Sequence, residues 1–303
     1  MKKHTAFTLI ELIFVIIIMG ILGKFGVEFL AKSYKSFIFS KVNNELQSSS
    51  SYAVELIASR LQYRIKDSVI ARTTKASTTP VGIGSVDNNT TYEVLEWIGY
   101  DNEGFRGHTY NAGSGAYLPT WSGILDLSSG NANNLVSPAT STTDINTTVS
   151  NLSGGKSSIA DIALYFIGSA SDISTGYGWD GTTALINLQQ GTMHPVTSTG
   201  IITDFVSSTG TSFSGIEVFE YYQLAWTAYA IVNENGTLML YWNYQPWLGE
   251  NYNDTGINVK SAMIMEDVDT FRFKTIGSVM KIQVCVNSSL VEDYSLCKEK
   301  TIY

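Results

Sequence analysis

The feature that most constrains this 303-residue chain is an apolar run near its N terminus. Residues 7–23 contain a single charged side chain, that of Glu11, and basic residues precede and follow the run. A membrane-spanning helix needs about 20 predominantly apolar residues, and basic flanks favour the cytoplasmic side. The run therefore predicts one membrane helix with its N terminus in the cytoplasm and the rest of the chain on the other side.

Two ordinary interpretations of this run leave a feature unexplained. A cleaved secretory signal ends in small residues at the cut site, but Phe29 stands two positions before Ala31, where a small residue is expected. A plain anchor has no use for Glu11, because a carboxylate in a spanning helix costs about 2.5–3.5 kcal/mol.

The residues Ala6-Phe7-Thr8-Leu9-Ile10-Glu11 follow a short basic leader and run into an apolar helix. This string resembles the N-terminal signature of type IV pilins and type II secretion pseudopilins. In that family a prepilin peptidase cuts before the Phe and methylates the new amino terminus. The resemblance implies a leader of residues 1–6, a cut between Ala6 and Phe7, and N-methylation of Phe7. The chain departs from the usual pattern at Ala6, where the family commonly has Gly.

The resemblance also gives Glu11 a role in assembly. Cleavage creates a cationic amine on Phe7 inside the membrane, and in the family the Glu of a neighbouring subunit meets that amine. Each buried charge is then neutralised only in the assembled bundle, and removing one partner of such a pair costs about 3–5 kcal/mol.

The chain after the apolar run continues with apolar residues at steps of three and four and with no Pro before Pro80. That spacing is typical of one face of a helix. We expect a nearly continuous helix from Phe7 to about Arg72, with a transmembrane and assembly part over residues 7–30 and an amphipathic part over residues 31–72.

Residues 73–303 are expected to form a globular β-rich head. Residues 81–211 are rich in Gly, Ser, Thr and Asn and predict long loops, whereas residues 216–303 are dense in β-branched and aromatic residues. An Asn235-Gly236 turn and a Gly277-Ser278 turn each separate two such runs and predict two β-hairpins. The predicted fold class is α+β, with the long helix packed on an antiparallel sheet.

The two cysteines lie near the C terminus, at Cys285 and Cys297. Disulfides form in proteins that leave the cytoplasm, so we expect these two residues to pair in an exported head. The alternative is two unpaired buried thiols.

The remaining composition contains little that indicates catalysis. A net charge of −8 is opposite to the basic balance of a nucleic-acid-binding protein. His108 and His194 have no metal-ligand spacing, and we expect no cofactor and no enzymatic activity. The acidic stretches 101–104 and 250–254 have the oxygen density of a calcium loop without a full ligand pattern. Four aromatic residues could form a sugar-binding platform, the head core or an interface: Trp242, Tyr244, Trp247 and Tyr252.

The sequence therefore favours a non-enzymatic minor pilin or minor pseudopilin. Its implied partners are other pilin subunits, the prepilin peptidase and the bacterial inner membrane. Its implied location is a single-pass inner-membrane protein with a periplasmic head, which later enters a filament. Two alternatives stay open: a filament-tip adhesin that binds a glycan or surface, and a membrane-anchored periplasmic enzyme. The sequence does not separate a type IV pilus from a secretion pseudopilus.

Overall fold

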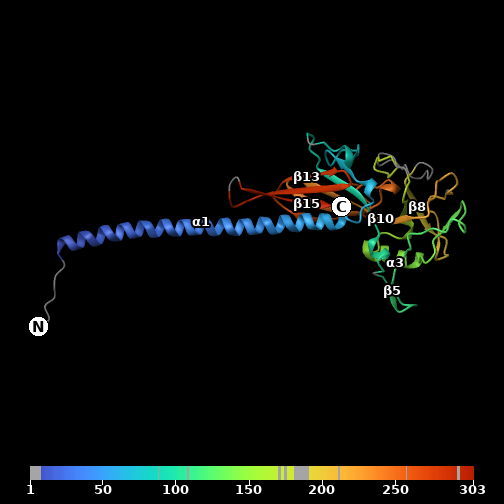
Figure 1. The fold of residues 1–303 in the computed structure, drawn as a ribbon, viewed down its shortest axis with the longest axis horizontal. Coiled ribbons are helices and arrows are strands. Elements are labelled where there is room, and N and C mark those ends of the chain that lie inside the picture. Colours follow the sequence, from blue (N-terminus) through green and yellow to red (C-terminus); the bar gives the residue numbers. More distant parts are fainter. Residues whose placement is uncertain are drawn as a thin grey trace.

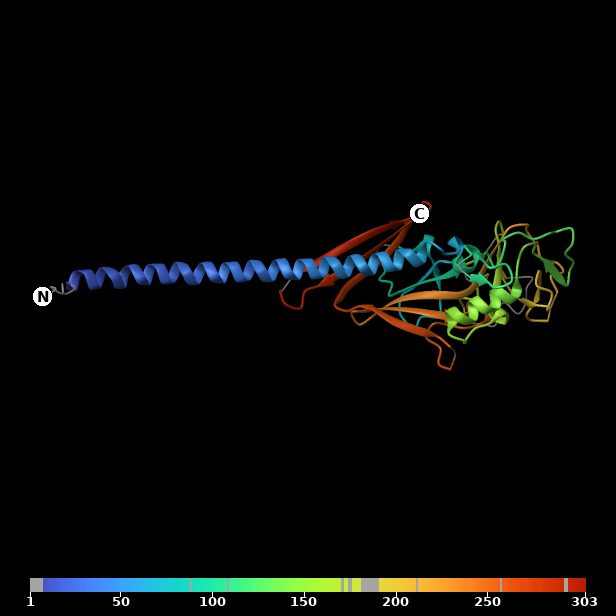
Figure 2. The same ribbon diagram turned by 90° about the horizontal axis from the view of Figure 1, so that it is seen from below.

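A single long helix carries a β-rich head at its C-terminal end (Figures 1 and 2). The structure is a computed structural model that describes residues 8–87, 89–107, 109–169, 172–173, 176–180, 191–210, 212–256, 258–291 and 294–303. Helix α1 spans Leu9–Leu61, and its 53 residues correspond to a length of about 80 Å at 1.5 Å per residue. The predicted α+β class, a long helix on an antiparallel β head, is confirmed.

Only the second half of α1 packs against the head. No residue of α1 before Val42 is buried, whereas Val54, Ile57 and Leu61 are almost completely inaccessible to solvent. The apolar first half projects from the head, as both views show. One helix therefore combines a core element of the head with a free apolar stem.

The helix ends at Leu61, so the predicted extension to Arg72 is wrong. The Arg64 guanidinium donates to the Leu61 carbonyl at 2.8 Å, and the Ile65 N–H donates to the carbonyl of Ile98 at 2.9 Å. The chain thus leaves the helix and pairs with a strand. Apolar residues at steps of three and four predicted that Ile65 and Val69 are buried, and both are. The same steps also suit a chain that runs beside a sheet.

Ten strands of the described chain form one large antiparallel sheet. They are β1 (Ile70–Arg72), β2 (Val81–Gly82), β3 (Val94–Tyr100), β6 (Asn134–Val136), β7 (Ala163–Phe166), β8 (Met193–Ser198), β9 (Asp204–Ser207), β10 (Tyr222–Glu234), β11 (Thr237–Tyr244) and β12 (Lys260–Met265). Strand β10 pairs with β3 on one edge and with both β7 and β11 on the other. The sheet therefore divides at β10 into a branch with β11 and β12 and a branch with β7, β8, β9 and β6.

The last three strands form a separate sheet that covers α1. Strands β13 (Val268–Ile276), β14 (Val279–Asn287) and β15 (Ser295–Ile302) pair in sequence order. One core joins α1, the inner face of this sheet and the near face of the large sheet, and contains Leu61, Trp97 and Ile282. Both predicted hairpins exist, β10–β11 and β13–β14, but residues 216–303 belong to two sheets instead of the expected one.

The segment predicted as loop-rich, 81–211, contains most strands of the large sheet and helix α3 (Thr142–Ser153). Ser141 caps the start of α3, and Gly154 ends it with a φ of 68°. Ile145 and Val149 are buried in this helix, one turn apart. Thr, Ser and Asn have low helix propensity, so tertiary burial of this short apolar stripe decides the structure.

Smaller elements complete the head. They are helix α2 (Asn102–Phe105), strands β4 (Thr109–Asn111) and β5 (Ala116–Leu118), and the 3₁₀ turns η1 (Lys66–Ser68), η2 (Ile83–Ser85), η3 (Ile159–Asp161) and η5 (Pro246–Leu248). Gly236 and Gly277, with φ of 89° and 62°, occupy the turns of the two hairpins, where a left-handed backbone favours glycine.

A buried ion pair ties the start of the large sheet to its centre. Arg72 on β1 donates to Glu96 on β3 at 2.5 Å, and the hydroxyl of Tyr244 donates to the other Glu96 oxygen at 3.0 Å. Arg72 also donates to the carbonyl of Trp179 at 2.7 Å. Burial raises the pKa of Glu96, and the contacts with Arg72 and Tyr244 oppose that rise. The Glu96 charge is thus compensated by neighbours on two other strands, β1 and β11.

We expect Glu96→Gln to lower the free energy of unfolding by about 3–5 kcal/mol, because it leaves the Arg72 charge buried without a counter-charge. Urea unfolding of the full chain in nonionic detergent, followed by tryptophan fluorescence, measures this change. The matched control is Glu55→Gln, which removes the exposed ion pair with Lys300 and should change stability by about 1 kcal/mol or less. Equal losses in the two variants would contradict the assignment.

Candidate functional site

The described chain begins with a reciprocal helix cap that contains Glu11. The Thr8 hydroxyl accepts the Glu11 N–H at 3.4 Å, while the Glu11 carboxylate accepts the Thr8 N–H at 2.9 Å and the Thr8 hydroxyl at 2.8 Å. This arrangement is a capping box, in which two otherwise unpaired N–H groups at a helix start are satisfied. The predicted cleavage residues Ala6 and Phe7 lie outside the described residues.

The capping box was readable in the sequence but was not part of the prediction for Glu11. A Thr followed three residues later by Glu before an apolar run is its signature, and Thr8 and Glu11 have this spacing. The cap holds the carboxylate at the first turn of α1. Among the described residues, no cation lies within ion-pair distance of it. Its negative charge therefore remains available to a cation from elsewhere.

The helix that follows the cap is apolar enough to cross a membrane. An 18-residue window of α1 has a mean hydropathy of 2.3, and none of that window is buried in the structure. Lys24 and Glu28 lie one turn apart, with 3.9 Å between Nζ and Oε1, and both are exposed. They lie directly after the apolar run of residues 7–23.

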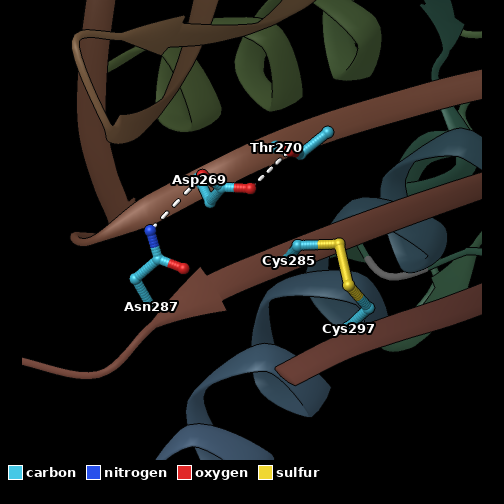
Figure 3. The surroundings of a disulfide bond; sticks show 5 residues. All are labelled: Asp269, Thr270, Cys285, Asn287 and Cys297. Carbon is cyan, nitrogen blue, oxygen red and sulfur yellow. Dashed lines mark hydrogen bonds between the residues drawn. A yellow bond between two sulfur atoms is a disulfide. The ribbon is translucent and has the colours of Figure 1, made fainter. Parts of the chain in front are cut away.

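The head contains a disulfide that joins two strands of the sheet over α1. Cys285 on β14 lies directly opposite Cys297 on β15, and the two form a disulfide (Figure 3). On the neighbouring strand, Asp269 accepts hydrogen bonds from Thr270 at 2.7 Å and from Asn287 at 3.3 Å. The disulfide and this pair of hydrogen bonds lie on adjoining parts of the three-stranded sheet. The disulfide links β14 to β15, and the Asn287–Asp269 hydrogen bond links β14 to β13.

Of the two histidines outside the leader, His108 lies outside the described residues and His194 is a core residue. Its ring stacks on Phe166 with 4.7 Å between ring centroids. Burial lowers the pKa of His194 to about 4, so the ring is neutral near pH 7. The sequence favoured a histidine that is solvated or has its hydrogen bonds satisfied, but this ring is buried and its Nδ1 has no hydrogen-bond partner among the described residues.

The acidic stretches considered for calcium use their carboxylates for local structure. Asp101 caps α2 by accepting the Gly104 N–H at 3.0 Å and also accepts the indole N–H of Trp121 at 3.1 Å. Burial raises the pKa of Asp101 to about 6. Glu250 accepts the backbone N–H of Gln245 at 2.8 Å. Over the residues that are described, no three His, Cys, Asp or Glu side chains gather into a metal-binding group.

The aromatic residues considered as a sugar platform are mainly core. Tyr244, Trp247 and Tyr252 are each no more than 3% exposed and pack in one core cluster behind the large sheet. Trp242 is partly buried against the core around α1. Since a stacking platform needs exposed ring faces, these residues support the head instead of presenting a ligand surface.

We expect the double variant Cys285→Ala/Cys297→Ala to lose about 3 kcal/mol of stability, the value that loop-closure entropy gives for a loop of this length. Urea unfolding of the exported protein measures the loss. Non-reducing peptide mapping of the unmodified chain should recover the two cysteine peptides as one linked species. Free thiols at both positions after export would contradict this prediction.

Comparison with known proteins identifies the N-terminal segment. Residues 1–23 match the family model described as the prokaryotic N-terminal methylation motif. No curated protein and no solved structure matches the chain. Because the long apolar helix α1 begins at Leu9, inside the motif, the chain has the layout of a membrane-anchored, pilin-like protein. It carries the N-terminal signal of type IV pilins and pseudopilins.

Proposed function

We propose that this chain is a minor subunit of a type IV filament or a type II secretion pseudopilus, processed by a prepilin peptidase. The observation that carries the proposal is the methylation motif at residues 1–23 together with α1, which begins inside the motif at Leu9 and whose first half is apolar and unburied. An apolar helix of this length needs a lipid or protein environment. The bilayer supplies it before assembly, and the helices of neighbouring subunits supply it in the filament.

The capping box adds a physical reason for the position of Glu11. It holds the carboxylate against the Thr8 N–H, one peptide bond from residue 7. In a bundle of such helices, the amine of one subunit and the carboxylate of the next meet at the same depth. A pair of opposite charges in an apolar medium is strongly favoured over either charge alone. That preference fixes the axial position of each subunit relative to its neighbour.

The large head supports a minor role over a major one. Residues 73–303 make up most of the chain, and a major subunit must fit many identical neighbours around it. A bulky head is easier to place at a filament end. No observation favours the glycan-binding adhesin, since three of the four aromatic residues considered for a sugar platform are core. None favours a membrane-anchored enzyme.

Processing is the first test. We expect a prepilin peptidase to cut between Ala6 and Phe7 and to methylate Phe7. Mass spectrometry of membrane-extracted protein should find an N-terminal peptide that begins with methylated Phe7. Ala6→Gly should be cut at least as fast, and Ala6→Leu should block cutting because the site takes a small residue. An intact Met1 terminus in cells with active peptidase would refute this step.

Substitution of Glu11 is the second test. Because Glu11 also forms the capping box, its control must remove the cap and keep the carboxylate. We expect Glu11→Leu to be processed, inserted and stable, yet to enter filaments at least about tenfold less, because an unpaired buried charge costs more than 1.4 kcal/mol. Immunoblotting of sheared filaments, or of cross-linked pseudopili, measures entry.

Thr8→Val separates the two roles of this residue pair. It removes the cap but keeps the carboxylate, so its entry into filaments should stay within a few-fold of the unmodified chain. Glu28→Leu controls for loss of any helical carboxylate and should also enter normally. If Glu11→Leu assembles as well as these two variants, the charge-register argument is wrong.

A further inference from the structure

The head contains several Asn-x-Ser/Thr triplets, the sequence pattern of acceptors for N-glycosylation. Bacterial enzymes that glycosylate Asn also favour an acidic residue two positions before it. Only Asn89, which follows Asp87, and Asn146, which follows Asp144, meet both conditions. The full set of Asn residues that begin such a triplet is Asn88, Asn89, Asn146, Asn151, Asn235, Asn253 and Asn287.

The structure places the two acidic triplets in opposite settings. Asn146 lies in the middle of helix α3, and its side-chain oxygen accepts the Ile159 N–H at 2.9 Å. Thr148, the last residue of the same triplet, is buried. A triplet in a helix with a buried hydroxyl cannot enter an enzyme site unless the helix unfolds. The fold therefore excludes Asn146 in spite of its sequence.

Asn89 lies in an exposed bend that leads into β3. One oxygen of Asp87 shapes this bend by accepting the Asn89 N–H at 2.8 Å and the Thr90 N–H at 2.7 Å. Asn89, Thr90 and Thr91 are all exposed. Among the described residues, no hydrogen bond occupies the Asn89 side-chain amide or the Thr91 hydroxyl. We call residues 89–91 the acceptor triplet.

The acceptor triplet does not pack flat against the rest of the head. An open groove of about 530 Å³ is lined by Asn89 and Thr91 together with Arg272, Lys281 and Gln283 from β13 and β14. A space of this size beside the triplet leaves its side chains accessible. An enzyme can therefore bind the triplet while the head stays folded.

The other described triplets each lack one of these features. Asn151 lies within α3. Asn235 occupies the tight turn between β10 and β11, with a φ of 52°. The amide nitrogens of Asn253 and Asn287 already donate hydrogen bonds to other segments. Of the triplets in the described part of the chain, only the acceptor triplet combines exposure, an irregular backbone and a free amide.

We propose that Asn89 is N-glycosylated by a membrane-bound oligosaccharyltransferase whose donor is an oligosaccharide on a lipid pyrophosphate. The Asn89 Nδ2 attacks C1 of the first sugar, so that an N–C1 bond forms and the C1–O bond to the pyrophosphate breaks. The lipid pyrophosphate leaves with the bonding electron pair. A basic group of the transferase takes the proton that Nδ2 loses.

The inference goes beyond the proposed function and rests on it in one respect, the export of an anchored head. A lipid-linked donor is confined to the membrane, and in the proposed topology α1 anchors the head in the same membrane. Holding acceptor and donor at one surface raises their effective concentration. The anchored chain is thus a favourable acceptor before it enters a filament.

Expression of the full chain in a host of defined chemistry tests the assignment. The host is a bacterium that makes a periplasmic oligosaccharyltransferase and one lipid-linked oligosaccharide of known mass. The same strain without the transferase supplies the unmodified reference, and an acceptor protein of known site shows that the transferase is active. Mass spectrometry of peptides from the membrane-extracted chain should find the oligosaccharide on Asn89 and none on Asn146.

Substitutions in the acceptor triplet sharpen this test. Asn89→Gln and Thr91→Val should each lower the glycosylated fraction at least about tenfold, because the first displaces the amide and the second removes a hydroxyl that the enzyme binds. Thr91→Ser keeps the hydroxyl and should stay within a few-fold of the unmodified sequence. Asn146→Gln is the matched control and should leave the fraction unchanged. Near-UV circular dichroism checks that each variant is folded.

Three outcomes would overturn the proposal. The first is an equal glycosylated fraction at Asn146, and the second is a glycan on another triplet with Asn89 unmodified. The third is a chain without glycan in cells that modify the acceptor protein, provided that the bond between Cys285 and Cys297 shows that the head has been exported.

Failure of this proposal is distinguishable from failure of the proposed function. An exported head with unmodified Asn89 and a methylated Phe7 would contradict the glycosylation and leave the filament subunit standing. A glycan on Asn89 in a chain that keeps Met1 would contradict the processing step and leave the glycosylation standing.

Discussion

The unburied apolar surface of α1 is the constraint on which the rest of the molecule depends. The second half of the helix is buried between two sheets, but residues 9–37 are all exposed. This surface requires lipid or neighbouring helices, and the methylation motif lies at its start. The head must in turn hold the helix firmly enough for its free half to act as a rigid stem.

The head meets that requirement with two sheets of different construction. The large sheet supplies one wall of the core around α1 and is tied together by the buried contacts of Arg72 and Glu96. The three-stranded sheet supplies the other wall and is held by the disulfide between its last two strands. The second branch of the large sheet, beyond β10, packs around a core of its own.

The N-terminal site illustrates how one residue can have a local and an intermolecular role. Within the chain, Glu11 satisfies the Thr8 N–H at the start of α1. In the proposed assembly, the same carboxylate neutralises an amine from a neighbour. The local role needs only a hydrogen-bond acceptor, whereas the assembly role needs a full charge. Comparing Thr8→Val with Glu11→Leu therefore separates the two roles.

The sequence alone determined the apolar stem, the methylation motif and both hairpins, because each depends on residues close together in the chain. Tertiary structure decided where α1 ends, since Ile65 and Val69 fit a helix and a strand equally well until Ile65 pairs with Ile98. It also decided that α3 is a helix and that Tyr244 and Trp247 are core. Burial and cross-strand pairing are long-range effects, and residue periodicity does not encode which surfaces will meet.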